Sequence, residues 1–277
     1  MIKENKEGFK PEIEEIKNLE WEEQNKKYEF LLNKDYSIRD YIEDKEINLE
    51  EGHRKEGESV VIGCIDEGIF RRIPLAGSGC LFLTKEEILD FIKERKVNII
   101  TSHENCGAAL VWAKRENPNK DITQEQADEL LKKYINGIAD EAEITFKYIF
   151  AKEMKRPKEY HSARMIFFNN VKDYYPSGIE KIPLAFSIER FTMHQKDNVK
   201  KRLKLAINIA FGDHGFGEKF TKEEPLIIAC CLNENDNSEE IKGEINEILN
   251  EMENEFKDIK NIKERIKIDY FFVPAKK

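Results

Sequence analysis

The sequence predicts an α/β protein with a mostly parallel sheet of four to five strands, helices on both faces and an N-terminal helical extension. Short runs rich in β-branched residues recur along the chain, and longer segments with helical spacing of apolar residues separate them. This alternation is typical of βαβ units, whose parallel strands are buried on both sides. The 277 residues are 40% hydrophobic, which is enough for one large core.

The N-terminal segment, residues 1–57, is polar and rich in helix-favouring residues. Ile13, Ile16 and Leu19 recur at near-helical spacing, so we expect one or two amphipathic helices that pack on the main domain or on a partner subunit. The alternative is a mobile extension, because the apolar content of this segment is low. The main domain is expected over residues 58–277, since no repeat of 20–50 residues and no Gly/Ser-rich linker divides it.

Strand-like and helix-like patterns then follow one another along the main domain. Strands are expected at residues 59–63, 97–101, 164–168, 225–232 and 265–273. Helices are expected at residues 85–96, from Gly107 onward, at 123–155 and at 239–262. Thr84 and Thr123 stand directly before two of these helices, where a threonine side chain can cap the first turn.

Net charge and the distribution of apolar residues argue against two classes of partner, nucleic acids and membranes. The formal net charge is -9, which argues against a nucleic-acid partner. The N-terminus lacks the apolar region of a signal peptide, and the longest weakly polar stretch, residues 73–83, is far too short to span a membrane. We therefore expect a cytoplasmic protein that contacts neither nucleic acid nor membrane.

Two short motifs follow the first two expected strands of the main domain. Cys64-Ile65-Asp66 comes directly after residues 59–63, and His103 and Cys106 come directly after residues 97–101. In open α/β sheets, ligands gather at the carboxyl ends of the strands, so neighbouring strands would bring these side chains together. Five cysteines in a chain of this length are not a disulfide scaffold and are better interpreted as metal or catalytic chemistry.

The three side chains Cys64, His103 and Cys106 suit Zn2+, which favours thiolate and imidazole ligands. Cys106 would lie near a helix N-terminus, where the helix dipole favours a thiolate. Three ligands leave a fourth position for water or for Asp66, and such an open position is typical of catalytic rather than structural zinc. The alternative is a pair of buried core cysteines beside a hydrogen-bonded histidine.

The remaining histidines and cysteines lack such a pattern. His214 lies in a glycine-rich loop, residues 211–217, where it would be a proton shuttle, part of a gating loop, or a solvent-exposed histidine. Surface positions are expected for His161 and His194, and buried packing positions for Cys80, Cys230 and Cys231.

The two motifs resemble those of the β-class carbonic anhydrases, which carry a C-x-D-x-R element and an H-x-x-C-G element after successive strands. The resemblance covers roughly residues 59–112. It implies zinc bound by Cys64, His103 and Cys106, and a parallel sheet extended at one edge by an antiparallel strand. It also implies a homodimer or higher oligomer in which residues 1–57 act as a dimerisation arm.

The activity implied by the resemblance is that of a zinc-dependent lyase, reversible hydration of CO2 to bicarbonate through zinc-bound hydroxide. Asp66 would accept a hydrogen bond from the hydroxide and orient it, or would ligate the zinc directly and close the site. Two alternatives stay open: a zinc-binding relative that acts by binding a partner, and a zinc hydrolase of another small molecule such as COS or CS2.

One position departs from the family pattern. The family places an arginine two residues after the aspartate, to pair with it, and here that position is Gly68. Arg71 and Arg72 lie nearby, so Arg72 is a candidate catalytic residue that would serve Asp66. The run from Arg72 to Gly77 also resembles a later R-x-A-G element of the family, and in that match Arg72 belongs to a backbone turn instead.

Overall fold

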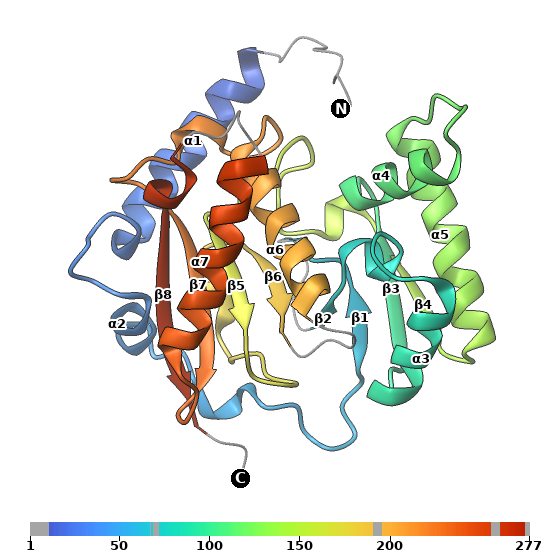
Figure 1. Cartoon of the computed structure of the whole chain (residues 1–277), viewed down its shortest axis with the longest axis horizontal. Coiled ribbons are helices and arrows are strands. Elements are labelled where there is room, and N and C mark those ends of the chain that lie inside the picture. Colours follow the sequence, from blue (N-terminus) through green and yellow to red (C-terminus); the bar gives the residue numbers. More distant parts are fainter. Residues whose placement is uncertain (1–10, 67, 69–71, 191–195, 256–260, 275–277) are drawn as a thin grey trace.

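The computed structural model describes residues 11–66, 68, 72–190, 196–255 and 261–274 (Figure 1). Its strands form two four-stranded sheets, with the orders β2-β1-β3-β4 and β6-β5-β7-β8. All strand pairs within these two sheets are parallel. The predicted α/β class with a mostly parallel sheet is therefore confirmed.

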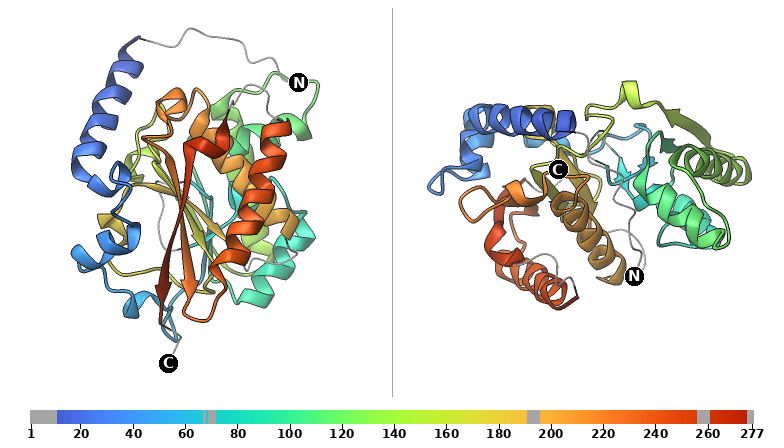
Figure 2. Two further views of the ribbon diagram at one scale, coloured as in Figure 1. Left: turned by 60° about the vertical axis from the view of Figure 1, so that its left-hand side comes forward. Right: turned by 90° about the horizontal axis from the view of Figure 1, so that it is seen from above.

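The first sheet carries its helices on one face. Its strands are β1 (Val61–Gly63), β2 (Ile73–Pro74), β3 (Ile99–His103) and β4 (Thr145–Ile149). Its helices are α3 (Lys85–Arg95), α4 (Gly107–Glu116) and α5 (Gln124–Glu141), which lie on the same side of the sheet (Figure 2). The Thr84 and Thr123 side chains accept hydrogen bonds from backbone N–H groups in the first turns of α3 and α5, which confirms both predicted helix starts.

The second sheet is covered on both faces. Its strands are β5 (Met165–Asn169), β6 (Ala185–Glu189), β7 (Leu226–Asn233) and β8 (Ile266–Val273). Helices α6 (Lys196–Phe211) and α7 (Ser238–Glu255) lie on one face, and α1 (Pro11–Lys27) and α2 (Ile38–Asp44) lie on the other (Figure 2). Short 3-10 helices complete the chain at Glu29–Leu31, Glu50–Gly52, Ala76–Gly79, Ala151–Glu153, Ile179–Lys181, Gly217–Lys219 and Ile262–Arg265.

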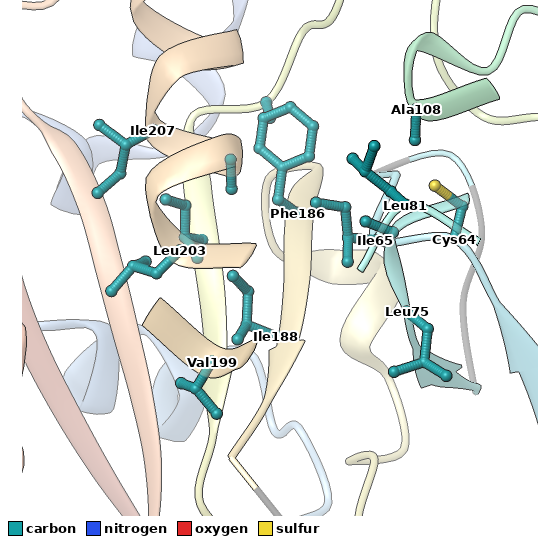
Figure 3. Packing of buried hydrophobic residues seen from close by; sticks show 14 of the residues in the cluster. Cys64, Ile65, Leu75, Leu81, Ala108, Phe186, Ile188, Val199, Leu203 and Ile207 are labelled. Atoms are coloured by element: carbon teal, nitrogen blue, oxygen red, sulfur yellow. The ribbon is translucent and has the colours of Figure 1, made fainter. Parts of the chain in front are cut away.

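Strand alternation divides the buried side chains between two cores. Phe168 and Cys230 belong to a large core that continues from α6 and α7 into the first sheet, whereas Phe167 and Phe271 belong to a core beneath the 3-10 helix Glu29–Leu31 and α2. The large core is continuous between the sheets. Figure 3 shows part of it, with Val199, Leu203 and Ile207 of α6 beside Phe186 and Ile188 of β6, and Ile65, Leu75 and Leu81 of the first half nearby.

Several details differ from the sequence predictions. The expected antiparallel edge strand is wrong, because β8 pairs parallel with β7 along its whole length. The described residues form eight strands rather than four to five, because β2, β4 and β6 were not predicted. The helix expected at residues 123–155 ends at Glu141: Glu143 adopts a left-handed φ of 54°, and residues 145–149 then pair with β3.

The described part of the N-terminal segment, from Pro11 onward, packs on its own chain. Its buried face differs from the predicted stripe, since Ile16 and Leu19 are 53% and 62% exposed while Trp21 and Tyr28 are buried. Trp21 packs edge-on against Phe216 and Phe220, and these aromatic contacts decide which face of α1 turns inward. The part of residues 1–57 that the structure describes is thus a structured extension, and its role as a dimerisation arm stays a prediction. Among the described helices, none combines the length and apolar character that crossing a membrane requires.

Candidate metal centre

Cys64, His103 and Cys106 meet at the carboxyl ends of β1 and β3. These two strands are neighbours, with Ile62 paired to Ile100, so Cys64 directly after β1 lies beside His103 at the end of β3. Cys106 occupies the N-cap position of α4. The sulfur and nitrogen atoms of the three side chains lie within 4.8 Å of one another, and all three residues are buried. The predicted convergence is therefore confirmed.

The His103 ring is oriented as a metal ligand would be. Its Nδ1 lies 2.9 Å from the Glu104 carbonyl oxygen, to which it can donate a proton. That tautomer leaves a lone pair on Nε2, which is buried and has no hydrogen-bond partner among the described residues. An unsatisfied buried polar atom costs about 1–3 kcal/mol, so a metal ion at this nitrogen would relieve a real penalty.

The two thiols form a close pair. Their Sγ atoms are 3.9 Å apart, and one thiol can donate to the other. This hydrogen bond lowers the pKa of Cys64 well below its ordinary value and raises the pKa of Cys106. Binding of a metal ion would release protons from the pair, because thiolates are the ligands.

Backbone groups and a buried carboxylate support both motifs. The Gly77 N–H donates to Cys64 Sγ at 3.3 Å, and Gly77 has a left-handed φ of 55°. Asp128 of α5 accepts hydrogen bonds from the backbone N–H groups of Asn105 and Cys106, at 2.7 and 3.2 Å. Outer contacts of this kind hold ligands in place before a metal ion binds.

Asp66 is paired with an arginine that the sequence did not single out. Arg156 Nε donates to Asp66 Oδ1 at 2.8 Å, and the Gly68 N–H donates to the same oxygen at 3.0 Å. Burial alone would raise the pKa of Asp66, but the cationic surroundings, with the Arg156 guanidinium in direct contact, hold it well below its ordinary value. Asp66 is therefore an ionised carboxylate beside the three-residue cluster, with Oδ2 4.0 Å from His103 Nε2.

Gly68 lies in a closely packed space beside Asp66. A Cβ built at Gly68 would lie 3.0 Å from Met154 Cβ and 3.1 Å from Arg156 Cγ. The space beside Asp66 is therefore filled by Arg156 and Met154, which follow the short helix Ala151–Glu153. The guanidinium reaches the same carboxylate from a different segment of the chain.

Arg72 binds backbone rather than the Asp66 carboxylate. It is buried, and its guanidinium donates to the carbonyl oxygens of Cys64 and Asp66. Its prediction as a catalytic residue serving the Asp66 side chain is therefore corrected: Arg72 holds the backbone that carries Cys64 and Asp66. Arg71 lies outside the described residues.

His161 also differs from its prediction. It is not a surface residue: its side chain is only 14% exposed, and Nδ1 lies 3.9 Å from Asp66 Oδ2. Its ring packs against Phe186 of β6 at 5.3 Å between centroids. Local sequence offers no signal for this placement, because His161 precedes β5 and reaches the centre only when the two sheets come together. His214 is exposed, and His194 lies outside the described residues.

The other cysteines are buried packing residues, as predicted: Cys80, Cys230 and Cys231. The closely spaced donor cluster comprises Cys64, His103 and Cys106 and does not include Asp66. Two sulfur donors and one unpaired imidazole nitrogen suit a soft or borderline divalent cation. These residues could therefore bind a metal ion. Comparison of the chain with protein-family models, curated proteins and solved structures found no match.

Proposed function

We propose that this protein is a zinc-dependent lyase of the β-carbonic anhydrase type, which hydrates CO2 reversibly to bicarbonate. Cys64, His103 and Cys106 hold the zinc ion, and Asp66 is the catalytic carboxylate. The observation that carries the proposal is the Asp66–Arg156 pair beside the three-donor cluster. It supplies the carboxylate–guanidinium contact that the glycine at position 68 cannot make.

Zinc with three protein ligands and an open position lowers the pKa of water and so supplies a hydroxide nucleophile near neutral pH. Arg156 and the Gly68 N–H hold Asp66 Oδ1 in place. Asp66 would then accept a hydrogen bond from the hydroxide and orient it toward the substrate carbon.

His161 is the proton carrier in this proposal. Its Nδ1 faces Asp66 Oδ2, and its partly exposed ring connects the buried carboxylate with the surface. An imidazole titrates in the range in which a proton must be passed to solvent at neutral pH. The five cysteines are all free, which suits a reducing compartment such as the cytoplasm.

The test is stopped-flow CO2 hydration on zinc-loaded protein, with metal content measured on the same sample. We expect activity from the wild type and its loss in Asp66→Ala, with zinc retained. Cys230→Ala is the matched control, because this buried cysteine lies in β7 outside the donor cluster. A zinc-loaded wild type without hydration activity would refute the proposed reaction.

A second candidate substrate class follows from the burial of the centre. The three donor residues are 1–4% exposed, and such burial favours a small substrate. COS and CS2 have the linear shape and electrophilic carbon of CO2. Hydrolysis of either molecule in the absence of CO2 hydration would favour this candidate, whereas zinc binding without any of these activities would favour a protein that acts by binding a partner.

A further inference from the structure

The two sheets of this chain have the same topology. In each, the second strand forms one edge and is followed across the sheet by the first, third and fourth strands, all parallel. The edge strands β2 and β6 are the neighbouring edges, and the strands of the two sheets run in opposite directions (Figure 1). The Ser187 N–H of β6 donates to the Ile65 carbonyl at 3.0 Å across this junction. Two units of the same topology that meet through equivalent edge strands are arranged as the subunits of a two-fold symmetric dimer are.

The third strands end in matching sequences. β3 ends at His103, which begins His103-Glu-Asn-Cys106, and β7 ends at Asn233, which begins Asn233-Glu-Asn-Asp236. A helix follows each sequence, α4 from Gly107 and α7 from Ser238. Asn233 thus stands at the position of His103, and Asp236 at the position of Cys106.

Strand register then assigns the third position independently. Ile100 lies three residues before His103 and pairs with Ile62, and Cys64 is two residues beyond that partner. In the second sheet, Cys230 lies three residues before Asn233 and pairs with Phe168. The residue two positions beyond Phe168 is Asn170, which therefore stands at the position of Cys64.

These counterpart residues are in contact with one another. Asp236 Oδ2 accepts hydrogen bonds from Asn170 Nδ2 at 2.8 Å and from the Asn233 backbone and side-chain N–H groups at 2.7 and 3.2 Å. Asn170 Oδ1 accepts from Arg190 Nη1 at 3.1 Å. Three polar side chains therefore converge at the strand ends of the second sheet, as Cys64, His103 and Cys106 do in the first, but hydrogen bonds join them.

We infer that the two halves are copies of one unit, and that the second half retains the framework of a metal centre in which Asn170, Asn233 and Asp236 replace the metal ligands. The chain then binds one zinc ion, and the second half serves the first as a built-in partner. His161, from the segment before β5, lies beside Asp66 of the first half, and Phe186 of β6 packs against its ring. Conversely, α1 and α2 precede the first sheet in the chain but pack on the second half, α1 against Phe216 and Phe220 and α2 on the second sheet.

The counterpart assignment predicts that metal ligands can be restored in the second half. Zinc content per chain is measured by mass spectrometry of the metal, and Co2+ absorption reports thiolate ligation. We expect one zinc ion in the wild type, none in Cys64→Ala/Cys106→Ala, and two in Asn170→Cys/Asn233→His/Asp236→Cys. Combining all five substitutions should leave one ion, now in the second half.

The outcomes separate this inference from the proposed function, on whose metal binding it rests. A wild type without zinc would refute the metal centre itself. A folded Asn170→Cys/Asn233→His/Asp236→Cys variant that still binds one ion, or a wild type that binds two, would refute the counterpart site alone. Neither result depends on CO2 hydration.

A reciprocal exchange tests the same assignment if that variant does not fold. Cys64→Asn/His103→Asn/Cys106→Asp places the hydrogen-bonded set in the first half. We expect it to bind no zinc but to melt at a higher temperature than Cys64→Ala/His103→Ala/Cys106→Ala, because the three polar side chains satisfy one another. An equal or lower melting temperature would contradict the equivalence of the two centres.

Discussion

At the end of β3, His103 presents a buried nitrogen that lacks a hydrogen-bond partner among the described residues, whereas at the end of β7 Asp236 gathers three hydrogen bonds. Both residues lie at or just beyond the carboxyl end of the third strand of a parallel sheet, and the two sheets have the same strand order. The contrast teaches that the framework brings three side chains together regardless of what they are. Their chemistry then decides the result: two thiols and an imidazole leave a site for a metal ion, while two amides and a carboxylate close on themselves.

The largest difference between the two centres should appear when one residue is removed from each. Cys106→Ala should abolish zinc binding and hydration activity, because it removes a thiolate ligand. Asp236→Ala, its counterpart, should leave zinc content and activity unchanged and should lower the free energy of unfolding by about 1–3 kcal/mol, since its donors lose their acceptor. Metal analysis, CO2 hydration and urea unfolding measure these outcomes, and full zinc occupancy in Cys106→Ala would remove this residue from the ligand set.

The next largest effect is expected at Arg156, which pairs with Asp66 but lies outside the two sequence motifs of the first half. Arg156→Ala should lower kcat/KM about 1,000-fold, because Asp66 loses the group that holds it in place. It should also destabilise the fold by about 3–5 kcal/mol through the unpaired buried carboxylate. Adding Gly68→Arg to Arg156→Ala should restore part of the activity, since removing the Arg156 side chain removes one of the close contacts at position 68 and frees the place of its guanidinium beside Asp66.

Failure of Gly68→Arg to restore any activity in a folded Arg156→Ala protein would contradict the assignment of Arg156 as the displaced partner of Asp66. Gly68→Arg alone is the control. It should be destabilising, because a Cβ at this position already meets Met154 and Arg156.

His161 tests whether the second half contributes to the chemistry of the first. His161→Phe should retain zinc and a stable fold, because the phenyl ring can still pack against Phe186. It should lower kcat about 100-fold if the imidazole carries the proton. Imidazole added to the buffer should raise kcat of the variant while leaving the wild type unchanged. An unchanged kcat in His161→Phe would limit the role of the second half to packing.

The smallest effect is expected where the two halves join, at Glu189 of β6. Burial raises the pKa of this carboxyl above its ordinary value of 4.5, against the opposing charge of Arg95, whose Nη2 is 2.9 Å away. A raised pKa means that the native state holds the proton more tightly than the unfolded state, so this group lowers stability as pH rises from 4.5 through its raised pKa. Urea unfolding across this range should show that the free energy of unfolding depends less on pH in Glu189→Gln than in the wild type. Identical slopes for the two proteins would contradict the raised pKa of Glu189.

Local sequence determined the elements on which the centre is built. The apolar runs before Cys64 and His103, and the threonine caps before α3 and α5, predict strands and helices because these signals act within a few residues. The spacing of His103 and Cys106 at a strand-to-helix turn likewise predicted that both side chains face one point. These predictions needed no knowledge of the rest of the chain.

Tertiary structure decided which residues complete the centre. Arg156 and His161 lie about 90 residues from Asp66 in the sequence, and no local pattern distinguishes them from surface residues. The buried face of α1 was likewise decided by Phe216 and Phe220 rather than by its own apolar spacing. The duplication was hidden for the same reason. The second half shares strand order and register with the first, and only hydrogen-bonded pairing between distant segments reveals this. In the sequence, the positions of the metal ligands carry different side chains in the two halves.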